Sequence, residues 1–146
     1  MSQRLFLVRH GRAEAQAEGG DAARRLTPEG RAAFEAHARA LGSSLAVTRV
    51  LASPLRRAME TAEILAAVTG ARAAPEAELS AGNLEGRDVL RLAARLGAGV
   101  ALVGHNPEFA DAVSALAGRR VDLPPGAIAA LDLSEGELGL AWVKVP

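Results

Sequence analysis

Short apolar runs alternate with longer helical stretches along the chain, and this alternation constrains the fold more than any other feature of the sequence. Runs at 5–8, 49–52 and 99–103 are predicted strands, because each is short, apolar and followed by polar residues or glycine. Capping residues, prolines and terminal glycines predict helices over 28–41, 55–68, 87–96 and 108–117. Strands and helices that alternate in this way form mostly parallel sheets with helices on both faces.

The end of the chain adds a different pattern. Two further strands are predicted at 127–133 and 138–145, joined by a hairpin at Ser134-Glu135-Gly136. The predicted fold class is therefore α/β, a three-layer α/β/α sandwich around a mixed, mostly parallel sheet. Residues 12–25 are predicted to form an exposed loop, and 71–86 an irregular segment.

Composition narrows the class of protein. The chain has 146 residues, and 49% of them are apolar, so one domain over 1–146 with its own core is expected. The absence of cysteine excludes disulfides, thiolate metal sites and cysteine nucleophiles. Zero net charge and 3% aromatic residues offer no general surface for nucleic acid or membranes. The apolar run at 5–8 is too short for a signal peptide or a membrane span, so a cytoplasmic address is expected.

Polar side chains follow three of the predicted strands. The three groups are Arg9, His10 and Gly11; Ser53, Arg56 and Arg57; and Gly104, His105 and Asn106. Because ligands of open α/β sheets bind beyond the carboxyl ends of the strands, these groups are expected to converge. Helix N-termini after Ser53 and His105 would add backbone N–H donors. Such a pocket suits a tetrahedral oxyanion.

These residue types also suggest a reaction. A neutral imidazole attacks phosphorus directly, leaving a phosphohistidine that water then hydrolyses. Arg9 and Arg57 would complement the charge on the phosphoryl oxygens and would keep His10 neutral. One nitrogen of His10 must stay free, so the other is expected to donate to a backbone carbonyl. Gly11 would let the main chain approach the phosphate closely.

The same three groups carry a family resemblance. Leu7-Val8-Arg9-His10-Gly11 resembles the signature of the histidine phosphatase superfamily, also called phosphoglycerate mutase-like. The segment 53–62 is similar to its second block, in which the key arginine precedes an alanine, here Arg57, and Val103-Gly104-His105 resembles the third. The resemblance implies that His10 is the nucleophile and that Arg9, Arg57 and His105 bind the transferring phosphoryl group.

Within that family, the segment 21–30 is similar to the small SixA-type phosphohistidine phosphatases, and so is the strand start at Gly126. The resemblance implies that Arg24 is a further phosphate or substrate contact. No cofactor is expected. No metal is expected either, because the two histidines lack a third ligand at suitable spacing.

Two departures from the family pattern bear on the substrate. Gln16 stands where mutases carry an asparagine, and Ser80 and Ala81 stand where mutases and general phosphatases carry a glutamate acid. An alkoxide leaving group needs such an acid, whereas a protonated phosphoimidazole leaves as neutral imidazole. The connections also lack a long insertion for a lid, so a shallow open cleft is expected. The favoured substrate is phosphohistidine on a signalling protein of the histidine phosphotransfer type, with inorganic phosphate as product.

Alternatives remain open at this level. The chain could be a phosphomonoesterase for a small phosphorylated metabolite, using Glu85 or Glu14 as acid. It could also be a catalytically silent module that binds phosphate or a phosphoprotein. His37 lies in mid-helix and is assigned no function, and Ser53 lacks the sequence context of an elbow nucleophile.

Overall fold

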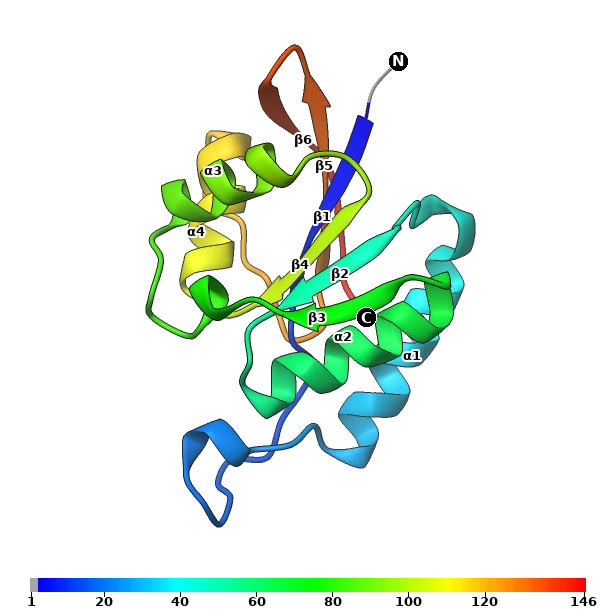
Figure 1. Ribbon diagram of the computed structural model, residues 1–146, viewed down its shortest axis with the longest axis vertical. Coiled ribbons are helices and arrows are strands. Elements are labelled where there is room, and N and C mark those ends of the chain that lie inside the picture. Colours follow the sequence, from blue (N-terminus) through cyan, green and yellow to red (C-terminus); the bar gives the residue numbers. More distant parts are fainter. Residues whose placement is uncertain (1–2) are drawn as a thin grey trace.

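The computed structural model describes residues 3–146, in which a six-stranded sheet carries helices on both faces (Figure 1). The strands are β1 (Gln3–Arg9), β2 (Arg49–Ala52), β3 (Arg72–Pro75), β4 (Val100–Gly104), β5 (Ile128–Ser134) and β6 (Glu137–Lys144). The helices are α1 (Pro28–Leu41), α2 (Arg56–Thr69), α3 (Gly86–Leu96) and α4 (Glu108–Ala117). Short 3-10 turns lie at Asp21–Ala23, Gly42–Ser44 and Ala77–Leu79.

The strand order is β3-β2-β4-β1-β5-β6. The first four strands in this order are parallel, β5 pairs antiparallel with β1, and β6 pairs antiparallel with β5 as the closing hairpin. The predicted fold class is therefore confirmed. No helix within residues 3–146 has the length and apolar character needed to cross a membrane.

The sheet is buried on both faces, which explains why its central strands are continuously apolar. Phe6 and Val8 of β1 belong to the core under α1 and α2, while Leu5 and Leu7 belong to the core under α3 and α4. Figure 1 shows the two helix pairs on opposite sides of the sheet. Successive side chains of a strand point to opposite faces, so β1 supplies both cores at once.

The start of α1 follows the predicted capping pattern. Thr27 is the N-cap, and its hydroxyl oxygen accepts a hydrogen bond from the backbone N–H of Gly30 at 2.9 Å. Pro28 occupies the first helical position, where its missing N–H costs nothing.

The prediction of an irregular segment over 71–86 is wrong in part. Within 71–86 the structure contains β3, which pairs in parallel with β2, Arg49 opposite Arg72 and Ala52 opposite Pro75. The sequence Arg-Ala-Ala-Pro has little intrinsic strand preference, and proline fits only at such an edge. The extended conformation of β3 therefore depends on pairing with β2, which is a tertiary contact and not a local preference of the sequence.

The register of the central strands positions the site. Arg9 lies opposite Gly104, and Ala52 lies opposite Val103, so β1, β2 and β4 end within one residue of one another. The next residue along each strand is therefore His10, His105 or Ser53. The backbone N–H of His10 donates to the carbonyl of Gly104 at 3.1 Å, which continues the ladder one step into the site.

Candidate active site

His10 follows β1 directly and is 9% exposed. Its Nδ1 lies 2.7 Å from the carbonyl oxygen of Gly11. Because a carbonyl only accepts hydrogen bonds, Nδ1 carries the proton of the neutral ring and Nε2 carries the free lone pair. The predicted donation to a backbone carbonyl is confirmed.

Burial, followed by the charges of Arg57, Arg9 and Arg24, lowers the pKa of His10 to about 4, against the opposing effect of the Gly11 hydrogen bond. The arginines act in the predicted direction, but burial is the largest cause. His10 is therefore neutral at physiological pH.

His105 follows β4 and faces His10, with the two ring centroids 5.2 Å apart. It is 3% exposed, and burial, together with the charges of His10 and Arg57, lowers its pKa to about 3. Its Nε2 lies 2.8 Å from the hydroxyl oxygen of Ser53, at the end of the neighbouring strand. Ser53 thus orients His105, a partnership that sequence analysis missed because the two residues are paired only through the sheet.

Arg57 lies in the first turn of α2 and is 5% exposed. Thr61, one turn later, donates from its hydroxyl to the carbonyl of Arg57 at 2.8 Å. The same hydroxyl oxygen accepts from the backbone N–H of Gly11 at 3.0 Å, which joins α2 to the segment after His10. Arg56 points elsewhere, and its guanidinium pairs with Glu60 at 3.3 Å. The choice of Arg57 rather than Arg56 therefore agrees with the geometry.

Asp21 lies between two of the predicted phosphate contacts. Its Oδ2 accepts from Nη2 of Arg57 at 3.2 Å, and its Oδ1 accepts from Nη1 of Arg24 at 2.8 Å. Its backbone carbonyl also accepts from Nη1 of Arg57 at 2.9 Å. The structure thus brings Arg24 to the site, and it adds an acid for which the sequence analysis predicted no function. The signal available in the sequence was an acid three residues before a candidate phosphate-binding arginine.

The loop of residues 12–25 is largely exposed, as predicted, but it is tied to the site. The loop of residues 12–25 is held to the rest of the chain by the backbone bridge between Ala13 and Leu26 and by the bonds of Asp21 to Arg57. Figure 1 shows this loop, in blue, extending past the carboxyl ends of β1 and β2. The pairing of Asp21 with Arg57 therefore links this exposed loop to an arginine of the site.

Arg9 contributes charge from the other side. Its Nη1 donates to the carbonyl of Leu123 at 2.9 Å, which also accepts from Asn106 at 3.0 Å. Its Nε is buried with no partner among residues 3–146. Burial lowers the pKa of Arg9, and its charge in turn lowers the pKa of both histidines.

Gly11 acts through its backbone. A Cβ built on it would lie in ordinary contact with Leu26, 3.4 Å from the nearest side-chain atom. Crowding by protein atoms therefore does not require glycine here, and the close approach to phosphate stays a prediction. The carbonyl of Gly11 orients His10, and its N–H binds Thr61.

The two acids named as alternatives are occupied elsewhere. Glu85 is the N-cap of α3 in a capping box with Asp88. The carboxylate of Glu14 accepts from the backbone N–H of Arg25 at 3.0 Å, and this bond lowers its pKa. Neither carboxylate is bonded to a histidine or arginine of the site.

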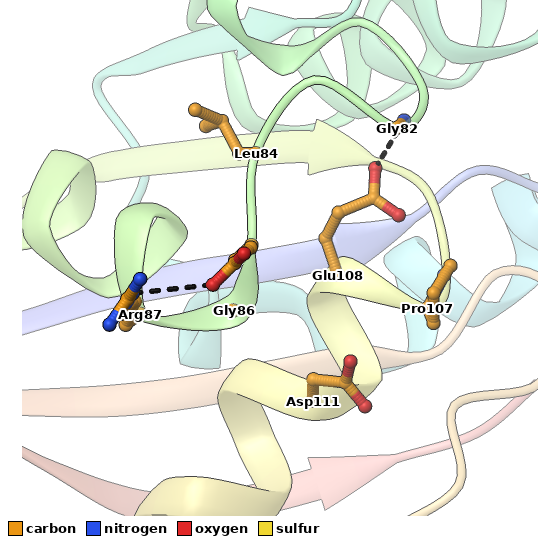
Figure 2. Close-up of a pocket in the computed structure, with 8 residues that line it drawn as sticks. Gly82, Leu84, Gly86, Arg87, Pro107, Glu108 and Asp111 are labelled. Atoms are coloured by element: carbon orange, nitrogen blue, oxygen red, sulfur yellow. Dashed lines mark hydrogen bonds and ion pairs between the residues drawn. The ribbon is translucent and has the colours of Figure 1, made fainter.

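A buried carboxylate that sequence analysis missed holds the mid-chain loop. Glu108, at the start of α4, is 6% exposed, and its Oε2 accepts from the backbone N–H of Gly82 at 2.9 Å (Figure 2). Its Oε1 has no partner among the described residues. Figure 2 shows Glu108 and Asp111 together on one side of a pocket beside this loop. Glu108 thus anchors the loop in which the family acid is missing.

Comparison with known proteins agrees with this geometry. The family model of the histidine phosphatase superfamily (branch 1) matches residues 5–134. A comparison with curated proteins found no match.

Solved structures match over nearly the whole chain. The protein histidine phosphatase SixA complexed with tungstate is 27% identical, with a TM-score of 0.81, over 96% of this chain and 95% of that chain. A chain from Agrobacterium tumefaciens assigned as SixA is 25% identical, with a TM-score of 0.81, over 100% and 99%. A phosphoserine phosphatase from Entamoeba histolytica, in complex with 3-phosphoglyceric acid, shares the fold at 14% identity and a TM-score of 0.72, over 98% and 97%.

The family match covers most of the chain, and the likeness to SixA extends over nearly all of it. The resemblance seen in the sequence is therefore confirmed. The chain belongs to the histidine phosphatase superfamily, is built like its SixA-type members, and is a phosphatase that releases phosphate from a phosphorylated substrate.

Proposed function

We propose that this phosphatase hydrolyses phosphohistidine on a signalling protein of the histidine phosphotransfer type, through a covalent phosphohistidine on His10. The observation that carries the proposal is the bond from Nδ1 of His10 to the carbonyl of Gly11. It leaves Nε2 with a free lone pair, and the lowered pKa keeps the ring neutral.

The chemistry takes two steps. In the first, Nε2 of His10 attacks phosphorus in line, the P–N bond of the substrate breaks, and the substrate imidazole leaves. Charge spreads over the three equatorial oxygens, where Arg9, Arg57 and the neutral His105 would offer donors, with Arg24 as a further contact. In the second, water attacks the phosphohistidine, releases inorganic phosphate and restores neutral His10.

The choice of substrate rests on leaving-group chemistry. Ser80 and Ala81 replace the family acid, and the carboxylates of Glu85 and Glu14 are bonded elsewhere. An alkoxide leaving without a positioned acid loses a rate factor of about 10²–10⁴. A protonated phosphoimidazole leaves without that help, so it is the substrate that this set of residues favours.

The structural relatives support the same assignment. A SixA protein similar to this chain was solved with tungstate, which is a tetrahedral oxyanion of the kind that cationic phosphate sites hold. Arginine forks and helix N-termini bind such anions through fixed donors.

The test compares two phosphodonors. We expect kcat/KM for N-phosphoimidazole to exceed that for an unactivated sugar phosphate by about a hundredfold or more. We also expect acid-labile phosphate on the wild-type protein, and neither turnover nor labelling in His10→Ala. His37→Ala is the matched control, because His37 lies at an exposed hydrogen bond to the carbonyl of Lys144 and should keep full activity.

Two results would contradict the proposal. A preference for the sugar phosphate, with His10 still labelled, would indicate a phosphomonoesterase of a small metabolite. Binding of phosphate without turnover of either donor would indicate a silent module.

A further inference from the structure

A carboxylate stands inside the group of arginines that is expected to bind phosphate. Asp21 bonds through Oδ2 to Arg57 at 3.2 Å and through Oδ1 to Arg24 at 2.8 Å. It also lies near enough to His105 to oppose the lowering of that residue's pKa. A negative charge here weakens the attraction for a phosphoryl dianion, so its presence calls for a function that a neutral side chain would not serve.

Asp21 is poorly suited to be the missing proton donor. Hydrogen bonds from Arg24 and the charge of Arg57 lower the pKa of its carboxyl. The group is therefore ionised wherever the enzyme works, and an ionised carboxylate accepts hydrogen bonds but donates none.

The location of Asp21 matches that of a leaving group. Its side chain is 64% exposed, whereas His10 is 9% exposed. In an in-line displacement the leaving group lies opposite the nucleophile, and here it must lie toward solvent, because the rest of the substrate protein is there. Asp21 stands on that solvent side of the arginines.

We propose that Asp21 is a specificity-determining residue, whose carboxylate accepts a hydrogen bond from the distal ring N–H of a protonated phosphoimidazole leaving group. The inference rests on the proposed function, and it names the residue that selects the substrate. A carboxylate has about four lone-pair sites, so Asp21 accepts this bond while it still holds Arg57 and Arg24.

The proton balance of the step explains the selectivity. A phosphorylated imidazole ring protonated on its distal nitrogen is cationic, and a neighbouring carboxylate favours that form. When the P–N bond breaks, its electron pair stays on the ring nitrogen, and the ring leaves neutral with its distal proton in place. The new bond joins phosphorus to Nε2 of His10, and Asp21 transfers no proton. An alkoxide or phenolate has no N–H to offer, and the carboxylate repels its developing charge.

The experiment replaces Asp21 with asparagine, which keeps the shape and removes the charge. We compare N-phosphoimidazole with p-nitrophenyl phosphate, whose leaving group needs no proton, at one neutral pH. For Asp21→Asn we expect kcat/KM on phosphoimidazole to fall about tenfold or more, the usual effect of losing a charged hydrogen bond. On p-nitrophenyl phosphate it should stay unchanged or rise.

Two further variants separate specificity from structure. Glu18→Gln removes one exposed negative charge from the same loop, at a residue with no side-chain bond among residues 3–146, and should change neither rate. Asp21→Glu keeps the carboxylate and should keep the preference for phosphoimidazole.

Asp21 would be only a structural partner of the arginines if Asp21→Asn changed both rates by the same factor. The inference would also be overturned if Asp21→Asn changed neither rate. Failure of the proposed function can be told apart from these results, because in that case the wild-type protein itself would not hydrolyse N-phosphoimidazole.

Discussion

The reactivity of His10 is set by its immediate surroundings. The carbonyl of Gly11 selects the tautomer, burial lowers the pKa, and Arg57, Arg9 and Arg24 add to that lowering. The neutral ring with a free Nε2 is therefore the resting state, and no proton has to be removed before attack.

This state is directly observable by NMR. In a pH titration of the free enzyme we expect His10 to protonate near pH 4 and His105 near pH 3, well below an ordinary histidine near 6.5. At pH 7 the ring nitrogen shifts of His10 should show a proton on Nδ1. A midpoint near 6.5, or a proton on Nε2, would contradict the geometry that the mechanism needs.

At the scale of elements, β1, β2 and β4 end within one residue of one another, and this brings His10, Ser53 and His105 together. The fit is tight at Gly104, the last residue of β4, where an added Cβ would lie 2.6 Å from the ring of Phe109 in α4. This contact sets how closely α4 packs behind the loop that carries His105.

Gly104→Ala should therefore destabilise the protein by about 1–3 kcal/mol, the usual effect of overpacking a core. Gly139→Ala is the matched control, because Gly139 is also a strand glycine, and an added Cβ there meets nothing within 4 Å. Chemical denaturation measures the free energy of unfolding of both variants. Equal stabilities of the two variants would show that Phe109 moves aside at little cost.

At the scale of the whole molecule, folding buries two neutral imidazoles. Between pH 6.5 and about 4 the unfolded chain protonates His10 and His105, while the folded protein does not. The unfolded state then binds more protons, so the free energy of unfolding rises with pH and is lost as pH falls.

We expect the protein to lose stability from pH 7 to pH 5, on the order of 2 kcal/mol for each of the two histidines. The double variant His10→Asn, His105→Asn should show a much shallower dependence in urea denaturation over the same interval. His37, whose pKa is also lowered by burial, remains in both proteins and does not affect the difference. An equally steep loss in the double variant would refute the assignment.

Much of the fold was predictable because its signals are local. The Thr27–Pro28 cap marks the start of α1, and continuous apolar runs mark the doubly buried strands β1, β2 and β4. The β3 strand was not predictable from Arg-Ala-Ala-Pro, since its conformation depends on pairing with β2.

The sequence by itself determined the fold class, the family, and the segments after the strands that carry Arg9, His10, Arg57 and His105, because each depends on residue types in a fixed order. Only the tertiary structure decided which atoms meet. It placed the proton of His10 on Nδ1, paired Ser53 with His105, and set Asp21 between Arg57 and Arg24. The tautomer of His10 depends on where the carbonyl of Gly11 points. The other partners are distant along the chain, and they come within bonding distance only through pairing across the sheet and through the loop of residues 12–25.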